Sequence, residues 1–110
     1  MKLWKIVTKR QAEEDAVEIW RVIAEDNHRA AEAFLDVIEE AASLLSATPE
    51  IGSPRYFCHL DLQGLRFLPL RKFENYPLFY RTLKDEEVIE IVRILHGARD
   101  LPRLFGGEES

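Results

Sequence analysis

The residues best suited to chemistry are polar side chains that directly follow a long apolar run near the end of the chain. The run, residues 88–95, is rich in β-branched and aliphatic side chains, and His96, Arg99 and Asp100 follow it around Gly97. An imidazole titrates near neutral pH and can transfer protons, and a guanidinium can bind carboxylate or phosphate with parallel hydrogen bonds. A structural role, in which His96 holds the turn before Gly97, is the favoured interpretation, and proton transfer is the alternative.

Arginines are concentrated in the second half of the chain. Residues 1–50 contain 11 acidic and 6 basic residues, whereas residues 51–107 contain 7 acidic and 9 basic residues. This excess is too small to predict a general nucleic-acid binder, and a single arginine is explained most simply by solvent exposure or an ion pair. If the chain cleaves RNA, its candidate catalytic residues are Arg66, Arg81, Arg93, His96 and Arg99.

The sequence lacks the motifs that hold cofactors. It has no glycine-rich phosphate loop, no closely spaced histidine pair for a metal, and no nucleophile with a neighbouring base, so we expect neither cofactor nor metal. The single cysteine, Cys58, excludes an internal disulfide, and no apolar run approaches the roughly 20 residues of a membrane span. Because no signal-peptide pattern is present, we predict a cytoplasmic protein without a membrane partner.

The first half of the chain predicts a strand followed by a helical hairpin. Residues 2–7 alternate loosely between apolar and polar side chains, which is typical of a short strand. Thr8 and Gln11 fit a capping box at the start of one helix, and Asn27 suits the N-cap of a second helix that runs to about Ser46. Because so few residues separate the helices, they must fold back against each other. The apolar stripe of the second helix is expected to contain Ala31, Phe34, Leu35, Ile38, Ala42 and Leu45.

The second half predicts strands connected by short turns. Two prolines and a glycine make residues 48–54 a loop, and residues 55–63 show no clear pattern. Pro77 lacks a backbone N–H, which predicts a position at an edge or at the start of a strand. The last predicted strand is apolar on both faces and should lie in the interior of its sheet. The three strands, which should form an antiparallel meander with turns at 71–75 and 84–87, are residues 65–70, 76–83 and 88–95.

Together these elements predict an α+β fold. The order is strand, helix, helix, strand, strand, strand, with the helical hairpin packed on a small antiparallel sheet. The hairpin covers one face of the sheet, so the other face is available to another chain. The aromatic residues that could form a docking patch are Phe73, Tyr76, Phe79 and Tyr80.

Four segments of the sequence resemble the RelE/ParE superfamily of bacterial type II toxin–antitoxin toxins. They are residues 16–27 (AVEIWRVIAEDN), 49–55 (PEIGSPR), 78–81 (LFYR) and 91–100 (IVRILHGARD). The resemblance covers nearly the whole chain and is closest to the ParE-like branch, whose usual Asp-Asn-Pro between the helices is here Asp26-Asn27-His28. It implies one toxin domain at residues 1–105, followed by a tail, residues 106–110, that we expect to be disordered.

The resemblance leaves two activities open, of which RNA cleavage is disfavoured. RelE-like toxins cut messenger RNA on the ribosome with lysines, arginines and a C-terminal tyrosine, and of these positions only Arg99 matches. The positions of the two lysines, of one arginine and of the tyrosine are occupied by Phe67, Pro69, Pro77 and Phe105. Phenylalanine and proline can neither transfer a proton nor neutralise a phosphate. Cleavage would need the alternative set of arginines and His96 given above.

Inhibition of DNA gyrase is the leading hypothesis. ParE-like toxins trap gyrase on cleaved DNA and do no chemistry of their own, so the resemblance implies a chain that is not an enzyme. The residues expected to contact the target are Arg93, His96 and Arg99. The expected partner is a cognate antitoxin, whose disordered C-terminal segment folds as a helix or strand over the apolar sheet face and the helical hairpin. The aromatic patch named above is expected to bind it. The alternatives are the ribosome as target, or a toxin fold retained as a non-toxic binding module.

Overall fold

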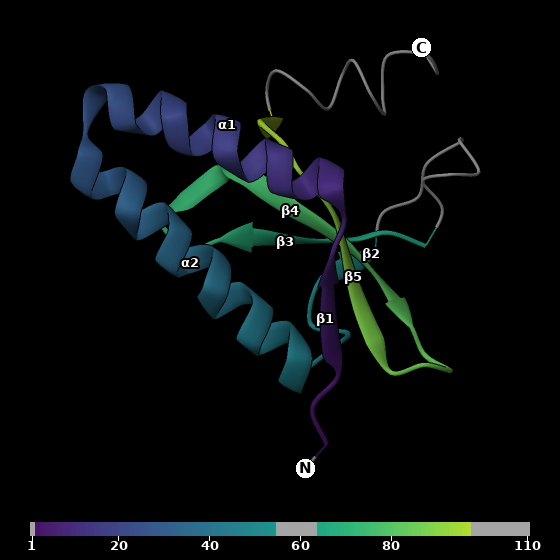
Figure 1. Ribbon diagram of the computed structural model, residues 1–110. Helices are drawn as coiled ribbons and strands as arrows, with labels where there is room; N and C mark the ends of the chain where they lie inside the picture. The colour runs from purple at the N-terminus through teal and green to yellow at the C-terminus, as the bar shows by residue number, and fades with distance from the viewer. Residues whose placement is uncertain (1, 55–63, 98–110) are drawn as a thin grey trace.

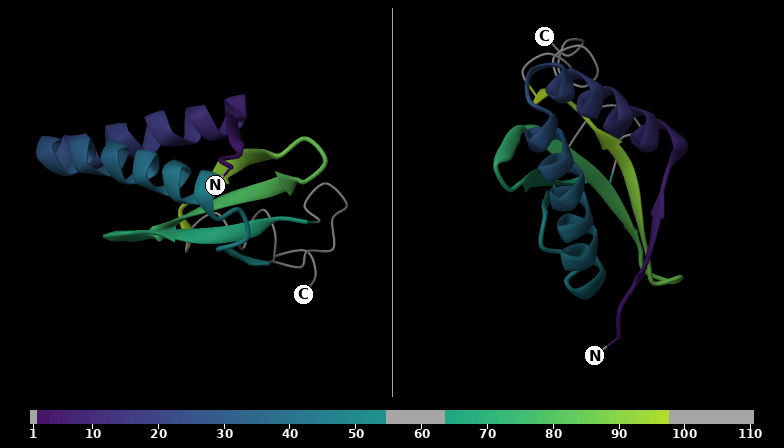
Figure 2. Two further views of the ribbon diagram at one scale, coloured as in Figure 1. Left: turned by 90° about the horizontal axis from the view of Figure 1, so that it is seen from below. Right: turned by 60° about the vertical axis from the view of Figure 1, so that its left-hand side comes forward.

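The computed structural model describes residues 2–54 and 64–97, in which two helices cover one face of a five-stranded sheet (Figure 1). Figure 2 shows the helices and the strands as two layers. The elements in chain order are β1 (Lys5–Thr8), α1 (Arg10–Asp26), α2 (His28–Ala47), β2 (Ser53–Pro54), β3 (Arg66–Leu70), β4 (Phe73–Leu83) and β5 (Val88–Ile94). No helix in the described part has the length and apolar character needed to cross a membrane.

The sheet is mixed, with the strand order β1-β5-β4-β3-β2. Strands β2 to β5 pair antiparallel, which confirms the predicted meander, but β1 runs parallel to β5. The prediction of a purely antiparallel sheet is therefore wrong at this edge, where the hairpin carries the chain across one face before the meander begins. The predicted loop also contains the short edge strand β2. Strand β5 is interior as predicted, and β4 is the middle strand.

The helical hairpin turns at a single residue, Asn27. Its Oδ1 accepts a hydrogen bond of 3.0 Å from the backbone N–H of Ala30, which confirms the predicted N-cap of α2. The capping box predicted for α1 is wrong, because Thr8 still belongs to β1. The backbone N–H of Lys9 donates to the carbonyl oxygen of Ile91 at 2.9 Å, so pairing with β5 continues past Thr8 and the helix begins at Arg10.

Pro77 lies inside the middle strand and neither at an edge nor at a strand start. The predicted turn at 71–75 is shorter than expected, and β4 already begins at Phe73. Pro77 is tolerated because it lies where the register between β3 and β4 shifts, directly before Leu78, the first residue of β4 in register with β5. Its carbonyl oxygen still accepts a hydrogen bond of 3.1 Å from the backbone N–H of Leu95.

Two apolar clusters lie on opposite faces of the sheet. The larger cluster joins both helices to the sheet and is centred on Phe34, Leu78 and Tyr80, all without exposed surface. Since side chains alternate along a strand, Phe79 points to the other face, where it contacts Leu65 and Leu95 in the smaller cluster. The expected disordered tail, residues 106–110, and the segment 55–63 lie outside the described residues.

Candidate functional site

The end of β5, which the sequence indicates as the functional region, is attached to α1 by an ion pair. The guanidinium of Arg93 donates to Asp15 through Nε at 2.7 Å and through Nη2 at 3.0 Å, and the backbone N–H of Ile94 donates to the same carboxylate at 3.0 Å. Only 10% of the Asp15 side chain is exposed, and 26% of the Arg93 side chain. The guanidinium of Arg93, which was predicted to contact a target, therefore binds α1 of the same chain.

Asp15 is a structural residue that the sequence analysis missed. As an acid near the start of a helix, it is explained most simply by the helix dipole. Its spacing indicates otherwise, because Asp15 lies three residues after Ala12 and four before Ile19, both of which are buried. An acidic residue within an apolar stripe needs a partner, and this pattern is the signal that could have identified it.

His96 lies just beyond β5, against an aromatic ring of β4. Its imidazole meets the ring of Tyr76 edge to face, with 5.4 Å between the ring centroids. Both side chains are partly buried. His96, one of the predicted site residues, thus packs on the start of β4 and remains partly exposed to solvent. Arg99, the third residue expected to contact the target, lies outside the described residues.

Arg66 helps to hold the segment between α2 and β2. Its Nη1 donates to the carbonyl oxygens of Glu50 at 3.3 Å and of Gly52 at 2.7 Å. The Tyr80 hydroxyl donates to the carbonyl oxygen of Pro49 at 2.9 Å and accepts from the backbone N–H of Gly52 at 2.8 Å. Burial raises the pKa of Tyr80, although the hydrogen bond from Gly52 opposes the shift.

Only glycine fits at position 52. A Cβ there would come within 2.7 Å of the Tyr80 ring and 2.8 Å of the backbone oxygen of Phe67. The nearby Lys84 ammonium lies 3.0 Å from the carboxylate of Glu50, and its hydrogen bond and charge hold the pKa of Glu50 below its usual value. Residues 49–52 are therefore fixed against the sheet by contacts that the sequence pattern did not reveal.

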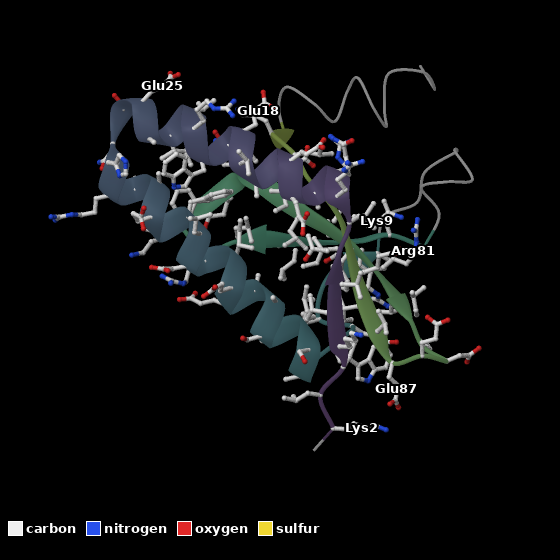
Figure 3. The ribbon with its side chains drawn as sticks, viewed as in Figure 1. Lys2, Lys9, Glu18, Glu25, Arg81 and Glu87 are labelled. Carbon is white, nitrogen blue, oxygen red and sulfur yellow. The ribbon has the colours of Figure 1, made fainter. Side chains whose placement is uncertain are left out.

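Arg81 forms a cross-strand ion pair. It lies opposite Glu90 in the register of β4 and β5, and its Nη1 is 3.2 Å from that carboxylate. Lys9 approaches the same carboxylate at 3.8 Å. Figure 3 shows the labelled Lys9 and Arg81 near each other, as expected for two residues that approach the same carboxylate. Opposite charges in this arrangement are expected to stabilise the sheet.

The candidate ribonuclease residues thus do not form one cluster in the described part of the chain. Arg66 binds residues 50 and 52, Arg81 binds Glu90, and Arg93 binds Asp15. Of the four candidates that the structure describes, only Arg93 and His96 lie at the same end of β5, and there the guanidinium is directed at α1.

The predicted aromatic patch is only partly accessible. Phe73 and Tyr76 are partly buried and both contact the ring of Phe34 edge to face, at centroid distances of 5.4 Å and 6.0 Å. Phe79 is 1% exposed and Tyr80 is 0% exposed. The prediction that these last two residues present a docking surface is wrong, because β4 is the middle strand and both of its faces are covered at this point.

An apolar groove between α2 and β3 was not predicted. It has a volume of about 160 Å³. Two of its lining residues, Arg71 and Glu40, form a bidentate ion pair, in which Nη2 of Arg71 lies 2.9 and 2.8 Å from the two carboxylate oxygens of Glu40. Leu44, on the helix side of the groove, is 43% exposed. The residues that line the groove are Val37, Glu40, Ala41, Leu44, Leu68, Pro69, Leu70 and Arg71.

The fold resembles solved toxin structures. It matches the chromosomal ParDE toxin–antitoxin system from P. aeruginosa with a TM-score of 0.68 at 20% identity, covering 86% of this chain and 96% of that chain. It also matches the toxin–antitoxin complex RelBE2 from Mycobacterium tuberculosis with a TM-score of 0.58 at 23% identity, covering 87% of this chain and 93% of that chain. At these identities the likeness shows the fold.

The family follows from a sequence model. A comparison with curated protein sequences gives no match. Residues 6–101, however, match the model of the "ParE toxin of type II toxin-antitoxin system, parDE". That match spans both helices, the whole described sheet except the start of β1, and the segment that follows β5. The chain therefore belongs to the ParE toxin family of type II toxin–antitoxin systems.

Proposed function

We propose that this chain inhibits DNA gyrase and is neutralised by a cognate antitoxin. Membership of the ParE family supports a toxin. The observation that favours gyrase over the ribosome is that Arg66, Arg81 and Arg93 each bind groups of their own chain at separate places. RNA cleavage needs groups that converge on a phosphate and a reacting hydroxyl, whereas trapping another enzyme needs only a binding surface.

The contact with gyrase is proposed at the end of β5 and in the segment that follows it. His96 is partly exposed there, and Arg99 follows within three residues. Arg93 remains part of the proposal, but through its bond to Asp15 and not as a direct contact. The positive charge of Arg99 would suit the acidic or phosphate groups of a gyrase–DNA complex.

A supercoiling assay with purified gyrase tests this proposal. We expect the wild-type toxin to block supercoiling and to accumulate cleaved DNA, and we expect His96→Ala and Arg99→Ala to raise the half-inhibitory concentration at least tenfold. Arg29→Ala, an exposed arginine at the start of α2, is the matched control and should change nothing. A protein that arrests growth but leaves gyrase untouched would contradict the proposal. A protein that binds its antitoxin and arrests no growth would be a non-toxic relic.

We also propose that the antitoxin occupies the groove between α2 and β3. The two similar solved structures are described as a ParDE system and as a RelBE2 toxin–antitoxin complex, which supports an antitoxin partner. The groove is lined mainly by apolar side chains and also contains the Arg71–Glu40 ion pair, so it suits an amphipathic segment that orders on binding. Phe73, the register partner of Leu70, extends this surface, and Tyr76 lies further along the same strand.

Two leucines of α2 provide a matched test of the groove. Leu44 lines it and is 43% exposed, whereas Leu35 is 41% exposed and does not line it. Nine residues separate them, which places them on opposite sides of the helix. We expect Leu44→Glu to weaken antitoxin binding at least tenfold in a titration, because a carboxylate would have to be buried in the groove. Equal losses of antitoxin affinity in Leu35→Glu and Leu44→Glu would show that the antitoxin does not bind in this groove.

A further inference from the structure

The Asp15 carboxylate accepts hydrogen bonds from two consecutive residues of β5, Arg93 and Ile94. One of its oxygens accepts hydrogen bonds from Arg93 Nε at 2.7 Å and from the backbone N–H of Ile94 at 3.0 Å, and the other accepts from Arg93 Nη2 at 3.0 Å. An ion pair that served only to hold a helix on a sheet would need the guanidinium alone. Here the helix also fixes the backbone of the strand.

A register shift lies just before this contact. Tyr80 is opposite Ile91, and Phe79 is opposite Arg93, so Val92 is an extra residue in β5. Such bulges redirect side chains and increase the local twist of a strand. The bulge interrupts the alternation of β5 where Arg93 turns to α1, and the carboxylate binds the chain at the first two residues after it.

The chain then passes directly to the proposed target-binding residues. The backbone N–H of Leu95 donates to the carbonyl oxygen of Pro77 at 3.1 Å, and His96 packs against Tyr76. A Cβ on Gly97 would lie 3.6 Å from the carbonyl oxygen of Asn75, so this residue also follows the start of β4 closely. Two residues, Ile94 and Leu95, therefore separate Arg93 from His96, and each makes a backbone hydrogen bond, to Asp15 and to Pro77 respectively.

We infer that Asp15 is a positioning residue for the end of β5. Acting through Arg93 and Ile94, it sets the direction in which the chain leaves the sheet and so places His96. What that end binds rests on the proposed gyrase function, whereas the positioning itself does not. An asparagine at position 15 keeps the shape of the side chain but has one acceptor oxygen and no charge, so it cannot satisfy all three donors.

The inference is tested by nuclear magnetic resonance on Asp15→Asn, without reference to any target. We expect the amide of Ile94 to exchange at least tenfold faster, and the ring signals of His96 to move, because the edge-to-face contact with Tyr76 changes. The amide of Ala30 at the start of α2 should keep its exchange rate. Glu18→Gln is the control, since Glu18 is exposed on α1 and points away from the sheet (Figure 3).

A second readout separates positioning from general destabilisation. We expect Asp15→Asn to raise the half-inhibitory concentration for gyrase at least tenfold while antitoxin affinity, which depends on the groove beside α2, changes less than twofold. Arg93→Lys keeps the charge but loses the two parallel hydrogen bonds, and it should move the same His96 signals by less. If Asp15→Asn does not fold, Arg93→Lys provides the test of the positioning role.

The outcomes distinguish the inference from the proposed function. If the wild-type chain fails to inhibit gyrase, the proposed function is wrong and the resonance measurements still decide the role of Asp15. If the His96 signals and the Ile94 exchange rate stay unchanged in both variants, the positioning role is overturned whatever the target. Equal losses of gyrase inhibition and antitoxin binding would also overturn it, because they would show a structural effect on the whole domain.

Discussion

At the scale of single residues, the Tyr80 hydroxyl holds residues 49–52 on the sheet. Tyr80→Phe removes the partner of the Gly52 N–H and of the Pro49 carbonyl, so we expect a loss of about 1–3 kcal/mol in the free energy of unfolding. Urea titration at pH 7 measures this. Tyr76→Phe is the control, because it keeps the ring that contacts Phe34 and leaves residues 49–52 untouched.

The same substitution has a defined pH dependence. Burial raises the pKa of Tyr80 above the ordinary value of about 10, so the unfolded chain ionises first as the pH rises. The protein keeps the full contribution of the neutral phenol below pH ~10 and loses it as the pH rises through the folded pKa. The stability difference between wild type and Tyr80→Phe should therefore shrink above pH ~10. A difference that grows with pH would contradict this assignment.

At the scale of elements, the helical hairpin depends on the Asn27 cap. Asn27→Ala removes the acceptor for the Ala30 N–H and should cost about 1 kcal/mol, which lowers the melting temperature by roughly 4–8 °C. Thr8→Ala is the informative comparison. A capping box would make it equally costly, whereas an exposed residue at the end of β1 predicts a change within about 0.5 kcal/mol. Calorimetry of both variants distinguishes the two.

The elements were predictable where a local pattern determines them. Both helices and the meander follow from spacing and turn residues, and the observed bounds agree with them closely except at β4, which begins three residues earlier than predicted. The local sequence determines less well which face of a helix is buried. Leu35, predicted to face inward, is 41% exposed, while Val37 and Ala41 are buried in its place. Because α2 packs on both α1 and β3, its buried stripe is set by two partners, and the periodicity of the helix alone cannot give that direction.

At the scale of the whole molecule, the partners of the charged residues were the part that sequence could not supply. Arg93 pairs with a residue 78 positions earlier, and Arg71 with one 31 positions earlier. Nothing in the local sequence distinguishes such arginines from free ones, so Arg93 was a candidate for binding a target. The resemblance gave the fold and the family, but the use of each arginine depends on how the helix layer lies on the sheet.

This arrangement of charges leads to a prediction about the ribosome. A toxin that cleaves RNA must stabilise a phosphate and move a proton in one place, whereas Arg66, Arg81 and Arg93 are bound at three places. We expect primer extension on translated messages to show no toxin-dependent cuts in cells that are already growth-arrested. Cuts that disappear in Arg81→Ala would contradict this. In that case Arg81 could act on RNA only after its ion pair with Glu90 is broken, so Glu90→Gln should increase the cleavage. If Glu90→Gln did not increase the cleavage, the role of Arg81 would be structural.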